Sequence, residues 1–236
     1  MTILITGASK GVGAALALQL AEEGQQLLLV ARNEYLIKGI ADQCNKIGGP
    51  GTASAIAYDL AGILEDPSAF EQLLGEHTTT IDVLVNNAGM LVNKPFHELT
   101  THGERSVFDI NYFVPAQLIR ICLPFLQQSE NASIVNITTM GAVQGSAKFP
   151  GLSAYSSSKG ALATLTECLA EEFKALNIRV NALAFGAVQT EMLQDAFPGM
   201  EAGTSPQEMG RFCTWFVLEG WRRMNGKMLP VSDSTP

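Results

Sequence analysis

Ile3-Leu4-Ile5-Thr6-Gly7-Ala8-Ser9-Lys10-Gly11-Val12-Gly13 is the most informative stretch of this sequence. Its first residues form a short apolar run that predicts a buried strand, and apolar residues at helical spacing over 12–23 predict a helix. Gly7 permits a tight turn, Gly11 lets the backbone approach a pyrophosphate, and Gly13 permits close helix–strand packing. The start of the helix would then offer unpaired N–H groups and a favourable dipole to phosphates.

This stretch alone has two interpretations. A glycine cluster with the spacing G-x-x-x-G-x-G can be no more than a turn, but its place between a first strand and a first helix favours a dinucleotide-binding loop. The predicted cofactor contacts in the loop are Gly7, Ser9, Lys10, Gly11, Val12 and Gly13.

Apolar runs alternate with helical patterns along the rest of the chain. Strands are expected at 3–6, 27–31, 53–58, 81–86, 133–138, 179–184 and 228–231, and helices at 12–23, 34–45, 67–76, 104–127, 154–175 and 206–219. Strands this apolar, separated by helices, indicate a parallel sheet that is covered on both faces. We predict an α/β fold: a three-layer doubly wound (Rossmann) parallel sheet of about seven strands, with its cleft at the carboxyl ends of the strands. No linker or repeat interrupts residues 1–236, so we expect one dinucleotide-binding (Rossmann) domain with a short substrate lid near 190–205.

The composition excludes several classes of protein. The chain has 236 residues, 47% of them hydrophobic and 16% charged, and a formal net charge of -8, which argues against a nucleic-acid partner. No apolar run approaches the ~20 residues that span a bilayer, and the first strand starts too early for a signal peptide. The four cysteines are far apart and the three histidines have no ligand spacing, which predicts neither disulfides nor a metal site. These features predict a soluble cytoplasmic protein without a membrane partner.

The end of the second expected strand indicates which cofactor is bound. An NAD site places an acidic residue there to hold the ribose 2′-OH, but this sequence has Ala31-Arg32. Arg32 and Lys10 place two cations near the position of a 2′-phosphate, although either could be an ordinary surface charge. We therefore predict NADP (NADPH) with NAD as the less favoured cofactor, and include the neighbouring Asn33 among the cofactor contacts.

Asp59 and Leu60 follow the third expected strand. Both could contact the adenine edge of the cofactor, or the aspartate could only cap a turn.

Tyr155-Ser156-Ser157-Ser158-Lys159 contains a tyrosine and a lysine that share one helix face at i,i+4. A phenol with a pKa near ~10 releases few protons at neutral pH, and a nearby ammonium lowers that pKa. The pair therefore can act as an acid/base device, although the same spacing is also common on solvated helix faces.

The glycine loop, Asn86-Asn87-Ala88-Gly89 and Tyr155-x-x-x-Lys159 occur in this order, and together they resemble the compact, single-domain branch of the short-chain dehydrogenase/reductase family. The resemblance implies that Tyr155 is the general acid or base, that Lys159 lowers its pKa and binds the nicotinamide ribose, and that Asn111 holds a proton-relay water. Further implied cofactor contacts are Asn87, Ala88, Gly89, Tyr155, Lys159, Gly186, Val188 and Thr190.

Thr139 stands where that family has its catalytic serine. Threonine keeps a hydroxyl, but its β-branching restricts the rotamer. The loop that follows is longer than usual, so Ser146 and Ser153 remain alternatives for this hydroxyl.

The predicted function is that of an NADPH-dependent carbonyl reductase, an oxidoreductase that moves a hydride between the cofactor and a carbonyl or alcohol substrate. The alternative is a catalytically impaired NADP-binding sensor or interaction protein. We expect a small, partly apolar substrate, because several apolar residues could line its pocket, although each could equally belong to ordinary core or lid packing: Phe149, Leu152, Phe185, Met192, Leu193, Phe197 and Met200. The resemblance also implies a homodimer or homotetramer that associates through the helices expected at 104–127 and 154–175.

Overall fold

Seven strands form one parallel sheet in the computed structural model, which describes residues 1–232. The strands are β1 (Thr2–Thr6), β2 (Gln26–Ala31), β3 (Ala53–Ala57), β4 (Val83–Asn86), β5 (Ser133–Thr139), β6 (Arg179–Phe185) and β7 (Met228–Val231). Their order is β3-β2-β1-β4-β5-β6-β7, and every pair is parallel. This confirms the predicted doubly wound α/β fold.

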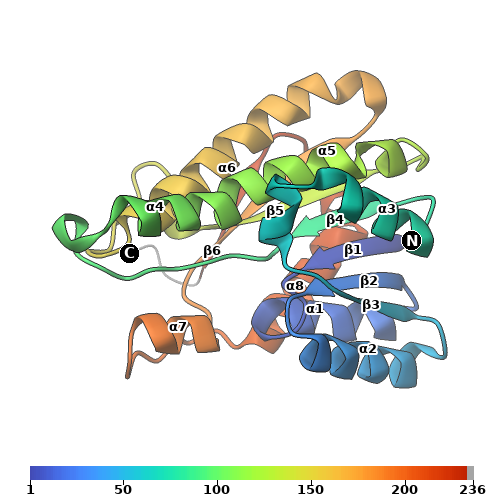
Figure 1. The fold of residues 1–236 in the computed structure, drawn as a ribbon, viewed down its shortest axis with the longest axis horizontal. Coiled ribbons are helices and arrows are strands. Elements are labelled where there is room, and N and C mark those ends of the chain that lie inside the picture. The colour runs from blue at the N-terminus through green and yellow to red at the C-terminus, as the bar shows by residue number, and fades with distance from the viewer. Residues whose placement is uncertain (233–236) are drawn as a thin grey trace.

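Helices cover both faces of the sheet (Figure 1). They are α1 (Gly11–Glu22), α2 (Glu34–Gly48), α3 (Pro67–His77), α4 (Thr101–Phe108), α5 (Val114–Leu126), α6 (Ser153–Glu172), α7 (Glu191–Ala196) and α8 (Pro206–Leu218). The helices α1, α2 and α8 pack on one face, while α3, α5 and α6 pack on the other. The short α7 lies in the expected lid region.

The alternation of side chains along the strands builds two separate hydrophobic cores. In β1, Ile3 and Ile5 belong to the core under α1 and α8, whereas Leu4 belongs to the core under α3 and α5. Successive strand residues point to opposite faces, so a strand that is apolar throughout is buried on both sides.

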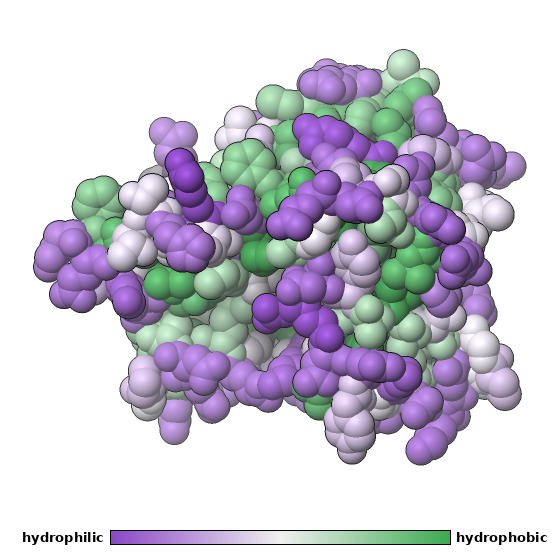
Figure 2. All heavy atoms as spheres, viewed as in Figure 1, coloured by the Kyte–Doolittle hydropathy of each residue, from purple (hydrophilic) through white to green (hydrophobic). Residues whose placement is uncertain are grey.

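The outer helices have one apolar side. Helix α2 buries Ile37, Ala41 and Cys44 and exposes charged residues such as Lys38. Its outer side is largely hydrophilic in the lower right of Figure 2. This spacing of apolar residues is the reason that the segment forms a helix against the sheet.

The segment expected as one helix over 104–127 consists of three parts. Helix α4 ends at Phe108, a π-helical turn η3 covers Asp109–Phe113, and α5 begins at Val114. The N–H of Val114 donates to the carbonyl of Asp109, five residues back. Pro115 has no N–H and lies in the first turn of α5, directly after this wide turn, where a proline is tolerated.

Residues 1–232 contain neither a membrane-spanning helix nor a cluster of metal ligands. None of the helices in this range combines the length and the apolarity needed to cross a bilayer. The same residues hold no group of three or more His, Cys, Asp or Glu side chains arranged to bind a metal ion.

Candidate active site

The carboxyl ends of the central strands bring the predicted site residues to one edge of the sheet. Strand β1 ends at Thr6 and β4 at Asn86, and the loops that follow are joined through the Thr6 side chain. Thr6 Oγ1 accepts hydrogen bonds from the backbone N–H groups of Asn87 and Ala88, at 3.0 Å each. The Asn87 Nδ2 donates to the carbonyls of Thr6 (2.9 Å) and Gly7 (3.2 Å). These hydrogen bonds, all within the chain, fix the two loops relative to each other.

Glycine is required at two positions of the first loop. Gly7 has φ +65°, and a Cβ there would lie 2.9 Å from the Cα of Ala88. A Cβ on Gly13 would lie 2.4 Å from the carbonyl oxygen of Gly7. Because neither glycine has a Cβ, these clashes do not arise, and helix α1 can start directly against the end of β1.

The start of α1 fits a pyrophosphate. The N-cap residue Lys10 makes no side-chain hydrogen bond to the first-turn amides. Those N–H groups and the helix dipole therefore remain available to an anion. Gly11 brings the lid close to this point, because a Cβ on it would lie 3.3 Å from Cγ2 of Thr190.

The residues expected around the adenosine have structural contacts of their own. Within residues 1–232, Arg32 makes no side-chain hydrogen bond or ion pair and is exposed at the end of β2, whereas Lys10 forms an ion pair with Glu191 of the lid. Asn33 caps α2 by accepting from Leu36 N at 2.9 Å. Asp59 accepts from Ala61 N at 3.1 Å, and the Leu60 side chain is buried. Asn33 and Asp59 thus have capping roles whether or not they also contact a cofactor.

Asn111 is fully buried in η3 and links the two halves of the site. Its Oδ1 accepts from Met90 N at 2.8 Å, and its Nδ2 donates to Met90 O at 2.8 Å and to Ser158 Oγ at 3.0 Å. Ser158 Oγ in turn donates to the carbonyl of Tyr155 at 2.9 Å. Asn111 therefore fixes α6 to the segment that follows β4.

Lys159 lies one turn after Tyr155 and is buried, while Tyr155 is half-buried. The Lys159 Nζ donates to the carbonyl of Ile137 in β5 at 2.8 Å, and a Cβ on Gly89 would lie 3.5 Å from it. Burial lowers the pKa of Lys159 to about 8 and raises the pKa of Tyr155 to about 12. In the protein alone, loss of hydration thus outweighs the expected effect of the ammonium on the phenol.

The three candidate hydroxyls differ in their surroundings. Thr139 ends β5 and is half-buried, and its Oγ1 accepts from Gly141 N at 3.3 Å. Ser146 donates to the carbonyls of Met140 and Val143. The Ser153 Oγ is buried in the first turn of α6 and has no hydrogen-bond partner within the described residues. Thr139 differs from the other two, because its oxygen only accepts within the described residues, which leaves its hydroxyl hydrogen available, and its side chain is half-buried.

The segment after β6 carries the other predicted cofactor contacts. Gly186 donates its N–H to Val231 O at 3.0 Å, and Val188 is buried and pairs with Thr204. Thr190 caps α7 by accepting from Leu193 N at 3.3 Å. This segment connects the sheet to the lid.

Apolar side chains are exposed in α7, in the segment after it and on the loop before α6. Phe149, Met192 and Met200 have exposed fractions of 42%, 41% and 40%. Phe185 and Leu152 are buried and contribute to the interior.

Four residues important to this geometry were not predicted from the sequence: Thr6, Ser158, Asn93 and Glu191. Asn93 Nδ2 donates to the carbonyl of Ala196 at the end of α7, at 2.7 Å. Of these four, only Ser158 could have been suggested by a local sequence pattern, since it is one of the three serines between Tyr155 and Lys159. The others act through partners more than 80 residues away along the chain, which no local pattern reveals.

Comparison with known proteins identifies the class. Residues 1–201 match the family model described as short chain dehydrogenase. The chain belongs to the short-chain dehydrogenase/reductase family.

Individual relatives share its fold and part of its sequence. The ketoacyl reductase HetN of Nostoc sp. is 32% identical over 196 residues, which cover 82% of this chain and 66% of that protein, slightly less than two thirds of its length. A short-chain dehydrogenase of Escherichia coli CFT073, solved with NADPH, is 27% identical with a TM-score of 0.88, and the match covers 97% of this chain and 95% of that one. A 3-ketoacyl-(acyl-carrier-protein) reductase of Brucella melitensis, solved with NADH, is 24% identical with a TM-score of 0.85, covers 99% and 97% of the two chains, and supports the fold.

Proposed function

We propose that this protein is an NADPH-dependent oxidoreductase that reduces a carbonyl group, or oxidises the corresponding alcohol, with Tyr155 as the general acid or base. The observation that carries the proposal is the placement of Tyr155 and Lys159 on one turn of α6, which Asn111 and Ser158 fix at the edge of the sheet next to the glycine loop.

The proposed chemistry divides the work between the cofactor and the protein. When NADPH is bound, its nicotinamide supplies the hydride. Tyr155, whose pKa is about 12, is protonated at neutral pH and can give its proton to the substrate oxygen as negative charge develops there. The ammonium of Lys159 stabilises the phenolate that remains, and Thr139 donates its hydroxyl hydrogen to the substrate oxygen. In this proposal Asn111 holds the water that returns a proton to Tyr155.

The preference for NADPH rests on Arg32 and Lys10. Arg32 is exposed at the end of β2, forms no ion pair within the described residues, and has a guanidinium that suits a phosphate. The ion pair of Lys10 with Glu191 is exposed, so a 2′-phosphate can compete for the lysine. A similar protein was solved with NADPH, which supports the same choice.

The substrate is proposed to be a small carbonyl compound with an apolar part. The exposed Phe149, Met192 and Met200 support this, since they are apolar side chains next to the lid and the loop before α6. A cytoplasmic location and a homodimer or homotetramer complete the proposal, by similarity to the family.

Tyr155→Phe tests the function directly. We expect the variant to bind NADPH as the wild type does but to lose turnover by about 10²–10⁴-fold, because the proton donor is removed. NADPH oxidation is followed at a fixed cofactor concentration with a panel of ketones, quinones and aldehydes. Tyr35→Phe, which removes a hydroxyl from an exposed position on α2, is the matched control and should keep full activity. Near-normal turnover of Tyr155→Phe would contradict the assignment.

A second candidate function, that of a catalytically impaired NADP-binding protein, is suggested by Thr139, which replaces the serine of the family pattern. If the wild type binds NADPH but turns over none of the panel, the result favours an NADP-binding sensor or interaction protein.

A further inference from the structure

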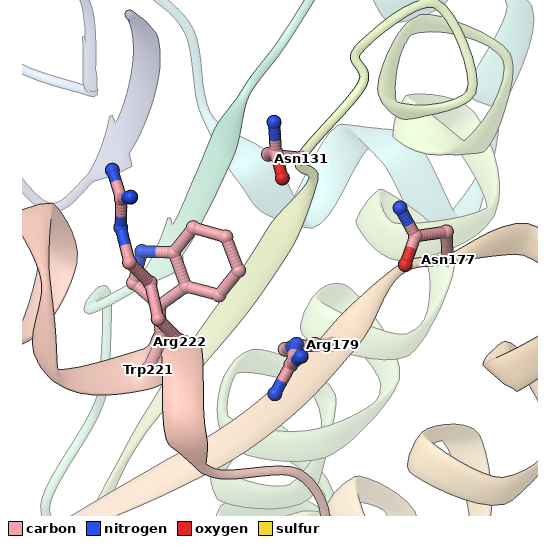
Figure 3. Close-up of a pocket in the computed structure, with 5 residues that line it drawn as sticks. All are labelled: Asn131, Asn177, Arg179, Trp221 and Arg222. Carbon is pink, nitrogen blue, oxygen red and sulfur yellow. The ribbon is translucent and has the colours of Figure 1, made fainter.

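A second pocket lies at the opposite edge of the sheet from Tyr155. It is lined by Asn131, Asn177, Arg179, Trp221 and Arg222 and has a volume of about 160 Å³ (Figure 3). Arg179 is the first residue of β6, and Trp221 and Arg222 belong to the short helical turn η6 (Gly220–Arg223). Strand β6 rises by ~3.3 Å per residue, so its first residue lies about 20 Å from its last. The pocket is therefore separate from the candidate active site.

The two arginines flank one buried indole, with their guanidinium groups on different sides of it (Figure 3). The guanidinium carbons of Arg179 and Arg222 each lie 5.9 Å from the centre of the Trp221 ring. Trp221 is 4% exposed and donates its Nε1–H to Val217 O at 2.9 Å, so the ring is held as a rigid wall. A distance of 5.9 Å is near the outer limit for a cation–π contact, which leaves the N–H groups of both guanidinium groups available.

No acidic side chain of residues 1–232 forms an ion pair with either arginine of this pocket. The four ion pairs found within residues 1–232 involve neither Arg179 nor Arg222, and neither guanidinium donates a hydrogen bond in that range. Glu130 precedes Asn131 in the sequence. Its backbone carbonyl, not its carboxylate, accepts a hydrogen bond from Asn177 Nδ2 at 3.0 Å. The lining thus has two cations and two carboxamides but no carboxylate, in a chain with a net charge of -8.

From this geometry we infer that the pocket binds a small, doubly charged oxyanion, such as inorganic phosphate, a phosphate monoester or a dicarboxylate. Each planar guanidinium can bind two oxygens of such an anion at once. The carboxamide of Asn131, which makes no side-chain hydrogen bond within the described residues, can donate to one of the same oxygens, because an anionic oxygen accepts more than one hydrogen bond. The buried indole removes water from one side of the pocket and so strengthens these interactions.

Trp221 provides a local probe for the test. The chain has two tryptophans, and Trp215 is half-exposed on α8. In a Trp215→Phe background, the fluorescence of Trp221 is recorded while phosphate, sulfate or succinate is added at constant ionic strength, and Tm is measured in parallel. We expect a saturable change in either signal with at least one of these anions. A response to phosphate would indicate a phosphate ligand, whereas a response to succinate would indicate a dicarboxylate.

Three arginine variants make the test specific. Arg179→Gln and Arg222→Gln should each raise the Kd at least tenfold. Arg223→Gln removes the same charge from the adjacent residue, which does not line the pocket, and Arg32→Ala removes a cation at the cofactor edge; both should change the Kd less than threefold. No saturable response to any of the three anions would overturn the proposal. An unchanged Kd in Arg179→Gln and Arg222→Gln, or an equal weakening in Arg223→Gln, would also overturn it.

Discussion

At the scale of single residues, burial decides the properties of the Tyr155–Lys159 pair. The sequence predicts that the ammonium lowers the pKa of the phenol, but in the protein alone burial raises the pKa of Tyr155 and lowers that of Lys159. Spacing along a helix shows that two groups are neighbours, whereas burial depends on the whole fold. A tyrosine that stays protonated suits the acid role, and an additional cationic charge would be needed to make it an effective base.

Arg32→Ala tests the cofactor preference. Loss of the guanidinium should raise the Kd for NADPH by about tenfold or more and change the Kd for NADH by less than threefold, because the 2′-phosphate alone distinguishes the two. The Kd values can be measured by quenching of protein fluorescence. Arg120→Gln, an exposed arginine on α5, provides the control for a general charge effect. A larger loss of NADH binding would reverse the assignment.

Thr139→Ala and Thr139→Ser separate the hydroxyl from the extra methyl group of threonine. We expect Thr139→Ala to lower kcat by about 10²-fold, as the loss of one donor to a developing oxyanion does, and Thr139→Ser to stay within a few-fold of the wild type. Ser146→Ala, measured with the same substrate, is the control. Equal rates for the two Thr139 variants would place the catalytic hydroxyl at another residue.

At the scale of elements, the π-helical turn η3 determines where Asn111 points. The turn contains one residue more than an α-helical turn, and Asn111 is directed between Met90 and Ser158. A straight helix over 104–127 would give the asparagine a different direction. Such wide turns are frequent at functional sites.

Asn111→Ala should reduce stability as well as activity. The N–H and carbonyl of Met90 would both lose their partner, and buried polar groups without partners cost about 1–3 kcal/mol each. We expect a decrease of about 2–4 kcal/mol in the free energy of unfolding, measured by urea denaturation. Asn131→Ala, in phosphate-free buffer, removes an exposed carboxamide and should change it by less than about 0.5 kcal/mol. A similar effect of both variants would show that the Asn111 network contributes little.

The sequence was sufficient to predict most elements but few of their contacts. Apolar runs and glycines predicted the seven strands and the loop from Gly7 to Gly13, because these signals are local. The end of α4 at Phe108 was not predicted, since nothing in the side chains of 109–113 distinguishes a π-turn from an α-helix. The ion pair of Lys10 with Glu191 joins residues 181 apart, and the arginine pocket also depends on the fold.

At the scale of the whole molecule, the buried ammonium of Lys159 opposes folding. Its pKa is about 8 in the folded protein and near 10.5 when unfolded, so between these values the unfolded chain binds more protons. The free energy of unfolding should therefore rise with pH over this window. The destabilisation by the buried ammonium is fully present below pH 8. Above pH 10 the raised pKa of Tyr155 has the opposite effect, because there the folded state retains the proton.

Lys159→Met should accordingly stabilise the protein while it abolishes turnover. We expect a gain of about 1–3 kcal/mol at pH 7, since removal of a buried charge outweighs the lost hydrogen bond to Ile137. Tm should rise by about 2–4 °C per kcal/mol, and the difference from the wild type should shrink between pH 7 and pH 9.5. Lys46→Met, at an exposed position on α2, should change Tm little at either pH. A variant that is less stable than the wild type, or a difference that does not depend on pH, would contradict this explanation.

The strand order also bears on how the protein is made. In the order β3-β2-β1-β4-β5-β6-β7, each new strand pairs with one that precedes it in the chain: β2 with β1, β3 with β2, β4 with β1, and then each of β5, β6 and β7 with the strand just before it. Each strand thus has a partner that is synthesised before it, and the longest separation is that between β1 and β4, since the second edge of β1 is paired only after β2 and β3 have been made.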